Sequence, residues 1–224
     1  MTEIRTESTT DADSQRYLVV LDVDSTLIEN EAIELLAAEA GSLELVAAVT
    51  ERAMRGELDF AESLRERVAT LAGLPESVFD TVRSQITVTP GASELIDTVK
   101  RHGGLVGVVS GGFHELLDPL AATLGLDFWR ANRLETAGGK LTGRVLGNIV
   151  DAQSKAESLR EWAEETNIPL SQTVAIGDGA NDLKMMAVAG LGIAFCAKPI
   201  VAEQADATID RRDLSLALDL IKLR

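Results

Sequence analysis

The chain has 224 residues, enough for one large domain or for a core domain that carries a smaller one. Apolar residues make up 46% of the sequence, so the chain can build a hydrophobic core and is not a disordered polypeptide. The formal net charge of −15 argues against binding to nucleic acid or to an anionic membrane, because both carry negative charge. The same charge repels a phosphorylated small molecule, so a site for one needs its own local cations.

The N-terminal segment and the cysteine content bear on the compartment. Residues 1–16 are polar and acidic without an apolar h-region, so we expect a disordered lead-in and no secretory signal. Cys196 is the only cysteine, which excludes an intrachain disulfide, and we expect it to be a buried small hydrophobic residue. The longest apolar run, residues 185–197, is too short to span about 30 Å of hydrocarbon. We therefore expect a cytoplasmic protein.

The first expected strand, Tyr17–Leu21, is followed by a segment that carries only helical patterns. This segment runs from Glu31 to Ile86, and we interpret it as a helical cap inserted into a core formed by residues 17–30 and 87–224. The expected helix boundaries in the cap are a stop at Gly41, a cap at Ser42 for a helix running to Gly56, a capping box of Asp59 with Glu62, and a start at Pro75.

The remainder of the chain alternates between apolar runs and helical patterns. The expected strands are Leu105–Val109, Thr173–Ile176 and Leu191–Phe195, and the expected helices are Ser93–Arg101, Glu115–Leu124 and Gln153–Glu165. A hairpin is expected over 128–146, around Gly138-Gly139, with an edge strand at 207–209 and a closing helix at 214–222. This order predicts an α/β fold with a Rossmann-like parallel sheet and right-handed crossovers.

Three of the expected strands run into polar loops. The loops are Asp22-Val23-Asp24-Ser25-Thr26, Ser110-Gly111-Gly112 and Gly177-Asp178-Gly179-Ala180-Asn181-Asp182. Because ligands of open α/β sheets bind beyond the carboxyl ends of the strands, we expect the three loops to form one site.

Asp22 and Asp24 are two positions apart in extended chain, so their carboxyl groups point to one side. Two close carboxylates both ionise readily only when a cation lies between them; otherwise one of them keeps a proton. With a divalent metal, one serves as a nucleophile and the other as an acid. The alternative interpretation is a solvated turn in which an aspartate caps the next helix.

Of the other two loops, the one at residues 110–112 suits the binding of an anion and the one at residues 177–182 suits the binding of a cation. Glycines at 111 and 112 let backbone amides approach an anion, and the Ser110 hydroxyl can donate to a phosphoryl oxygen. The oxygen-bearing side chains of residues 178–182 suit a hard cation such as Mg²⁺. Lys155, near the start of a helix, opposes the helix dipole unless an anion accompanies it. The alternatives are glycines used for turn geometry, an ordinary Asx-rich turn and a surface lysine.

In this order, the four motifs resemble those of the haloacid dehalogenase superfamily of phosphohydrolases, and within it the phosphoserine phosphatases. The matching residues are Asp22-Val23-Asp24-Ser25-Thr26-Leu27, Val109-Ser110-Gly111-Gly112-Phe113, Lys155 and Gly177-Asp178-Gly179-Ala180-Asn181-Asp182. A helical cap after the first motif also matches, and the resemblance covers the chain from about Tyr17 to its end. It implies hydrolysis of O-phospho-L-serine to L-serine and phosphate through an aspartyl-phosphate, the last step of serine biosynthesis.

The resemblance implies a role for each matching residue. Asp22 is the expected nucleophile, and Asp24 the acid that protonates the leaving oxygen and then activates water. Mg²⁺ is expected on the Asp22 carboxylate, the Asp24 backbone carbonyl and Asp178, with Asp182 positioning Lys155 or a metal-bound water. The expected phosphoryl-binding groups are Ser110, Gly111, Lys155 and Asn181.

In the cap, the resemblance assigns the substrate's ammonium to Glu31 and its carboxylate to Arg67. Met54 and Phe60 are expected to form an apolar wall over the site. The alternative for Arg67 is a solvated helix face at 65–67. Longer family members carry an added N-terminal regulatory domain, and because only about 16 residues precede the first expected strand, we expect no feedback control of that kind.

Other functions remain open at this point. The alternatives within the same family are a phosphatase acting on another small phosphomonoester such as phosphohomoserine, and a phosphotransferase that passes the phosphoryl group to a small alcohol such as homoserine. A signalling receiver is disfavoured, because receivers are about half this length and lack both the cap and an acid two residues after the nucleophile. A non-catalytic metabolite binder is disfavoured because every catalytic side chain is present. We expect a monomer or a homodimer.

Overall fold

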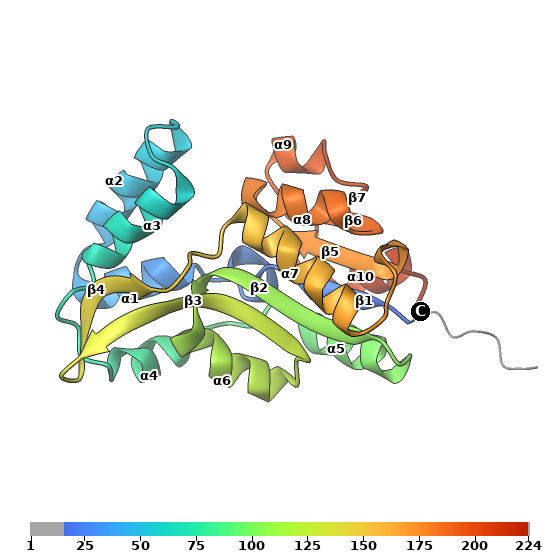
Figure 1. Ribbon diagram of the computed structural model, residues 1–224, viewed down its shortest axis with the longest axis horizontal. Helices are drawn as coiled ribbons and strands as arrows, with labels where there is room; N and C mark the ends of the chain where they lie inside the picture. The colour runs from blue at the N-terminus through green and yellow to red at the C-terminus, as the bar shows by residue number, and fades with distance from the viewer. Residues whose placement is uncertain (1–15, 224) are drawn as a thin grey trace, which may run out of the picture.

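The computed structural model describes residues 16–223, so the disordered lead-in expected for residues 1–16 falls outside it except for Arg16. A seven-stranded sheet in the order β4-β3-β2-β1-β5-β6-β7 forms the centre of the core (Figure 1). Neighbouring strands are parallel except β3 and β4, which form an antiparallel hairpin. The strands are β1 Leu18–Leu21, β2 Leu105–Phe113, β3 Phe128–Ala137, β4 Lys140–Leu146, β5 Thr173–Gly177, β6 Leu191–Phe195 and β7 Ala207–Ile209. The predicted α/β class is confirmed.

Helices cover both faces of this sheet and also form the cap (Figure 1). Their bounds are α1 Ala32–Ala40, α2 Leu43–Met54, α3 Phe60–Ala69, α4 Val78–Arg83, α5 Ala92–Arg101, α6 His114–Leu124, α7 Ala152–Glu165, α8 Leu183–Val188, α9 Pro199–Ala202 and α10 Ala217–Leu220. No helix within residues 16–223 has both the length and the apolar composition needed to cross a bilayer.

The central strand β1 shows why its sequence is apolar without interruption. Leu18 and Val20 belong to a core cluster that includes Trp162 of α7 and Met185 of α8. Val19 and Leu21 face the other way and share a cluster with α5, α6 and α10. All of these β1 side chains are fully buried. Helices on both sides therefore require an apolar residue at every position of the strand.

Helices α1 to α4 lie between β1 and β2 in the sequence and have a core of their own. This core also includes Leu134 of β3 and Leu141 of β4, so the cap is packed against the hairpin. Backbone hydrogen bonds reinforce the contact, with Gly73 N donating to Leu141 O at 2.8 Å and Leu141 N donating to Leu74 O at 2.8 Å.

The helix boundaries predicted for the cap are partly right. The capping box of Asp59 and Glu62 is present at the start of α3. Ser42 is the N-cap residue of α2 as predicted, but its side chain makes no capping hydrogen bond, and its hydroxyl donates to Thr70 Oγ1 at 3.1 Å. Helix α2 ends at Met54, two residues before the predicted stop. Pro75 does not start α4; its carbonyl closes a turn by accepting from Val78 N at 2.9 Å.

The core elements match their predicted positions closely, with three differences. Strand β2 continues to Phe113, so the Ser110-Gly111-Gly112 motif lies within its irregular end rather than after it. The closing helix divides into a short 3₁₀ turn and α10. Cys196 is only partly buried and has a left-handed φ of 46°, so the expectation of a buried residue is wrong. The hairpin is confirmed, and both Gly138 and Gly139 have positive φ.

Candidate active site

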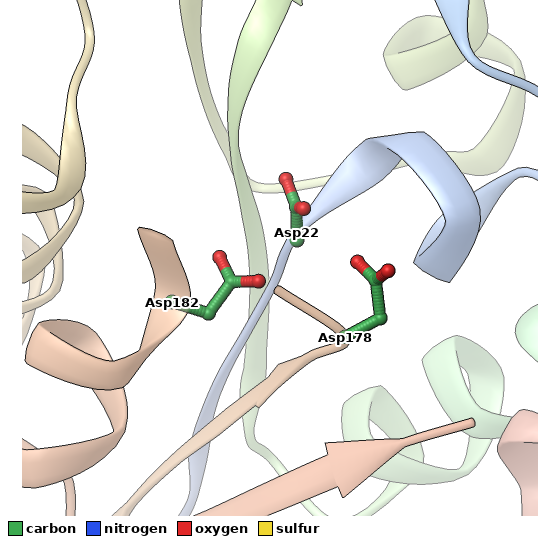
Figure 2. Close-up of side chains that lie close together, drawn as sticks. All are labelled: Asp22, Asp178 and Asp182. Atoms are coloured by element: carbon green, nitrogen blue, oxygen red, sulfur yellow. The ribbon is translucent and has the colours of Figure 1, made fainter. Parts of the chain in front are cut away.

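Three aspartates from two loops converge at the carboxyl edge of the sheet. Asp22 follows β1, Asp178 follows β5, and Asp182 ends the 3₁₀ turn Ala180–Asp182 that precedes α8. One carboxylate oxygen of each lies within 4.8 Å of the others, and Figure 2 shows the three side chains turned toward a common space. The strand register explains the meeting, since Leu21 pairs with Ile176 and Asp22 N donates to Ile176 O at 2.9 Å.

Lys155 is buried beneath this group of carboxylates. Its Nζ lies 2.6 Å from Asp22 Oδ1 and 2.7 Å from Asp182 Oδ1. The lysine lies in the first turn of α7, whose N-cap Asp151 accepts from Ser154 N at 2.8 Å. Burial lowers the pKa of Lys155, but the carboxylates of Asp182 and Asp22 outweigh it and hold the pKa above its ordinary value. Lys155 is therefore a buried cation with the anionic partners that its place on the helix requires.

The contacts of Asp22 leave one of its oxygens available. Oδ1 accepts from Val23 N at 2.7 Å and from Lys155. Oδ2 accepts no hydrogen bond from the residues that the structure describes. Burial first, and then the charge of Asp182, raises the pKa of Asp22 well above its ordinary value. A cation beside the carboxylate would keep it ionised.

Asp24 lies in a different environment from Asp22. Its Oδ1 accepts from Ala32 N, the first residue of α1, at 2.9 Å. A Cβ atom at residue 112 would lie 3.0 Å from Asp24 Oδ2, so this approach requires Gly112. Burial, followed by the charge of Glu31, raises the pKa of Asp24 to about 7. Its carboxyl group can therefore both give and take a proton near neutral pH.

The end of β2 presents the predicted phosphate-binding groups. Ser110 is buried, and its Oγ accepts from Gly112 N at 2.8 Å, which leaves the hydroxyl proton to be donated elsewhere. Asn132 of β3 holds this strand end, because its Nδ2 donates to Gly111 O at 2.8 Å. Asn132 Oδ1 accepts from Val150 N at 2.9 Å, just before α7. Sequence reasoning missed Asn132, since one polar residue in a strand gives no signal of its partners.

A cavity of about 440 Å³ lies between these loops and the cap. The predicted site residues that line it are Asp22, Asp24, Glu31, Met54, Phe60, Arg67, Gly111, Asp178 and Asn181. Ser110, Lys155 and Asp182 are buried and do not line this cavity, although Lys155 and Asp182 contact residues of its floor. Lys198, which sequence reasoning also missed, completes the cationic part of the lining. The only sequence signal for it is a Lys-Pro pair shortly after a buried strand.

Glu31 and Arg67 reach the cavity from its cap side. Glu31 Oε1 accepts from Ser25 Oγ at 2.6 Å, which fixes its carboxylate. Arg67 Nε donates to Ser63 O at 3.3 Å, and no carboxylate of a described residue lies within 4.0 Å of its guanidinium. Its other N–H groups are therefore available to a ligand. Arg65 is exposed and does not line the cavity, so the two arginines of this helix differ in environment.

The three-aspartate group has the donor chemistry that a hard divalent cation prefers. Both oxygens of Asp182 are already engaged, one by Lys155 and the other by Gly179 N at 3.0 Å. Asp178 accepts from no other described residue, and burial together with Asp182 raises its pKa to about 6. Asp22 and Asp178 are therefore better suited to contact a metal, with Asp182 in support. The sequence resemblance also predicts the backbone carbonyl of Asp24 as a metal ligand, and this atom does not belong to the group of three side chains.

The family of the chain follows from comparison with known proteins. The family model of haloacid dehalogenase-like hydrolases matches residues 19–187, and the chain belongs to this family. Phosphoserine phosphatase SerB2 of Mycobacterium tuberculosis is 55% identical over 206 residues, which are 92% of this chain and 50% of that protein. Phosphoserine phosphatase of Streptococcus thermophilus is 53% identical over 204 residues, which are 91% of this chain and 95% of that protein. The chain thus spans about half the length of the first relative and nearly all of the second.

Among solved structures, a phospho-aspartyl intermediate analogue of phosphoserine phosphatase is similar to this chain. The TM-score is 0.86 and the sequence identity 46%, and the match covers 92% of this chain and 99% of that one. The fold is therefore shared with that structure over almost the whole described range.

Proposed function

We propose that this chain is a Mg²⁺-dependent phosphatase that hydrolyses O-phospho-L-serine to L-serine and phosphate, the last step of serine biosynthesis. One observation carries the proposal. The carboxylate of Asp22, paired with Lys155, forms part of a cavity whose cap side holds Glu31 and Arg67. The proposed nucleophile thus shares the cavity with a carboxylate, Glu31, and a guanidinium, Arg67. These two groups complement the ammonium and the carboxylate of an amino acid.

In the first step, Asp22 Oδ2 attacks phosphorus in line with the bond to the serine oxygen. Lys155 and Val23 N hold Oδ1, so the attacking oxygen keeps one orientation. Asp24 gives its proton to the leaving oxygen, because a serine alkoxide is a poor leaving group. The products of this step are serine and a phosphoryl group bonded to Asp22.

In the second step, the Asp24 carboxylate takes a proton from water, and the water oxygen attacks phosphorus. The bond between Asp22 and phosphorus breaks, which frees phosphate and restores the carboxylate. A pKa of about 7 suits Asp24 to both roles at neutral pH. The Ser110 hydroxyl, the Gly111 amide, Lys155 and Asn181 bind the phosphoryl oxygens during both steps.

The metal role rests on Asp22, Asp178 and the Asp24 carbonyl, with Asp182 placing Lys155. Bound Mg²⁺ would offset the repulsion between the Asp22 carboxylate and the phosphate dianion. The all-oxygen donor set and the raised pKa values of Asp22 and Asp178 support a cation at this place.

Substrate recognition is assigned to the cap side of the cavity. Glu31 binds the ammonium, and Arg67 binds the carboxylate through its unpaired N–H groups. Met54 and Phe60 close the apolar side, which excludes water and strengthens these charge interactions. The location in the cytoplasm and the monomeric or homodimeric state remain predictions.

The test is phosphate release from a panel of small phosphomonoesters, including phosphoserine, phosphohomoserine and phosphothreonine. We expect phosphoserine to give the highest kcat/KM, and EDTA to abolish turnover until Mg²⁺ is restored. Added homoserine should leave phosphate release unchanged, whereas a phosphotransferase would release less. Asp22→Asn should abolish turnover while leaving the thermal unfolding transition cooperative. Preference for a phosphomonoester without an amino acid group would contradict the assignment of substrate.

A further inference from the structure

Lys198 is an exposed cation at the cavity that neither step of the proposed reaction uses. It follows β6, so it lies beyond the carboxyl end of a fourth parallel strand, beside the β5 loop that carries Asp178. Its side chain is exposed and lines the cavity together with Asn181 and Met54. Within residues 16–223 no carboxylate lies within 4.0 Å of its Nζ. Lys155, in contrast, is buried and held by two carboxylates.

The backbone around Lys198 is fixed although its side chain is free. The Lys198 carbonyl accepts from Val201 N at 2.9 Å and from Ala202 N at 3.1 Å, so this residue is the N-cap of α9. Just before it, Cys196 N donates to Ile209 O of β7 at 2.7 Å. The long, mobile and charged side chain of Lys198 therefore extends from a loop whose backbone is held by hydrogen bonds at the rim of the cavity.

The residues that line the cavity carry more acidic groups than cationic ones, and this imbalance indicates a role for Lys198. Its described lining contains the four acids Asp22, Asp24, Glu31 and Asp178, but only the two cations Arg67 and Lys198. The chain as a whole carries a charge of −15. Phosphoserine carries a net charge of roughly −2 at neutral pH, because its phosphate is mostly dianionic and its ammonium and carboxylate cancel. The approach of the substrate is therefore opposed by the protein.

The other cationic side chains offset this repulsion less while the substrate approaches, and the two charges of Mg²⁺ on Asp22 and Asp178 would be balanced by those two carboxylates. Lys155 is buried and is neutralised by Asp22 and Asp182. Arg67 lies on the cap side and is assigned to the carboxylate group of the substrate. Lys198 is the exposed cation on the core side of the lining, where the phosphate has to enter.

We propose that Lys198 attracts the phosphate group of the substrate into the cavity, and so acts on substrate capture rather than on bond breaking. This inference rests on the proposed function. A unit charge about 8 Å from a dianion in water lowers its energy enough to change capture by roughly 3- to 10-fold at low salt. At about 1 M salt the Debye length falls to about 3 Å, and this attraction is largely screened.

The test compares Lys198→Gln, Lys198→Arg and Lys198→Glu with Lys140→Gln. Lys140 begins β4 and does not line the cavity, and the hairpin turn lies well away from α9 in Figure 1. Lys140→Gln therefore changes the net charge equally without changing the rim. We measure kcat and kcat/KM for phosphoserine from about 0.01 M to about 1 M NaCl.

At low salt, we expect Lys198→Gln to lower kcat/KM by about 3- to 10-fold, and Lys198→Glu to lower it further. Lys198→Arg and Lys140→Gln should remain within about twofold of the unmodified protein, and kcat should change little in all four. The losses should shrink to less than about twofold at 1 M salt. Equal values for Lys198→Gln and Lys140→Gln at low salt would overturn the proposal, as would a loss that persists at high salt.

A second readout separates this inference from the assignment of substrate. Inorganic phosphate is titrated into the Mg²⁺-loaded protein by calorimetry at low and high salt. Lys198→Gln should weaken phosphate binding at low salt by a similar factor, and Lys140→Gln should not. This result would support the role of Lys198 even if phosphoserine proved not to be the substrate. Unchanged phosphate affinity in Lys198→Gln would count against it.

Discussion

Arg212 donates a hydrogen bond from Nη1 to the backbone carbonyl oxygen of Ser25 at 3.1 Å, joining residues 187 positions apart. Ser25 has a φ of 57°, a left-handed conformation that is uncommon for a residue with a side chain. It directly follows Asp24, the proposed acid and base. Its N–H donates to Asn30 O at 3.2 Å and its hydroxyl to Glu31. The C-terminal part of the chain therefore helps to hold the loop that carries Asp24.

Arg212→Ala should lower kcat for phosphoserine by roughly 3- to 30-fold, because the loss of a hydrogen bond of about 1–2 kcal/mol lets the Asp24 loop relax. The stability loss should be small. Arg211→Ala is the matched control, since Arg211 is exposed and its only carboxylate partner within 4.0 Å among the described residues is Asp213. Steady-state kinetics would check this, with Arg212→Lys expected to recover part of the loss. Equal kcat values for the two alanine variants would contradict the positioning role.

Lys155→Met should abolish turnover and lower the free energy of unfolding by about 3–5 kcal/mol, because two buried carboxylates lose their cation. Urea denaturation of the metal-free protein gives this value. Adding Asp182→Asn to Lys155→Met removes one of the unpaired charges, so the double variant should recover stability but no activity. Failure of the double variant to recover stability would show that the loss has a different origin.

Asp178→Asn should stabilise the metal-free protein at pH 8. Because burial and Asp182 raise the pKa of Asp178 to about 6 from an ordinary 3.8, the folded state holds this proton more tightly than the unfolded state. Stability from this group is thus present at low pH and is lost as the pH rises through 6. Removing the charge should stabilise by roughly 1–2 kcal/mol, allowing for partial exposure.

Thermal unfolding as a function of pH would check the Asp178 prediction. The advantage of Asp178→Asn should shrink as the pH is lowered toward 4, where the carboxyl group is protonated in the folded protein. Saturating Mg²⁺ should reverse the order, because metal binding stabilises the unmodified protein more than the variant. An unchanged order with Mg²⁺ would argue against Asp178 as a ligand.

Asp24→Asn should lower kcat for phosphoserine by about 10²- to 10⁴-fold, because both the acid and the base are lost. With p-nitrophenyl phosphate, whose leaving group needs little protonation, the first step should be spared. We therefore expect a rapid burst of about one p-nitrophenol per active site, followed by slow turnover. Stopped-flow absorbance would detect the burst. Its absence would mean that Asp24 is not required selectively for hydrolysis of the aspartyl-phosphate.

Arg67→Ala should raise KM for phosphoserine far more than KM for a phosphate ester without a carboxylate. The guanidinium lines the cavity with no ion-pair partner in the described structure, so its expected partner is the substrate. A loss of roughly 10- to 100-fold in kcat/KM corresponds to a charge-assisted bond. Arg65→Ala, on the exposed face of the same helix, is the control. Equal losses on both esters would contradict the assigned role of Arg67.

Much of the core domain and of the site at the carboxyl edge of its sheet could be predicted, because short stretches of sequence indicate them. Strand β6 has its predicted bounds, since a buried parallel strand is a continuous apolar run. The anionic partners of Lys155 follow from a cation placed at a helix start, where it opposes the helix dipole. The meeting of Asp22 and Asp178 follows from sheet topology alone.

The features that could not be predicted depend on contacts between residues that are distant in the sequence. The predicted helix start at Pro75 was wrong because a turn occupies that place, and Ser42 is at the predicted N-cap but makes a bond to Thr70 and no capping bond. The bonds of Asn132 to Gly111 and Val150 have no counterpart in any local pattern. The extension of β2 to Phe113 was missed because its glycines disfavour a strand, although Phe113 pairs with Asn132 of β3.

The attachment of the cap to the hairpin limits how a substrate can enter. Backbone bonds from residues 73–76 hold the base of the cap on β4, and the last turn of α3 packs against Gly143. The turn between α2 and α3 is not tied to the hairpin in this way, and it carries Met54 and Phe60 at its two ends. Because the base is held and the tip is not, we expect any widening of the entrance to occur as a tilt of this tip rather than as a lift of the whole cap.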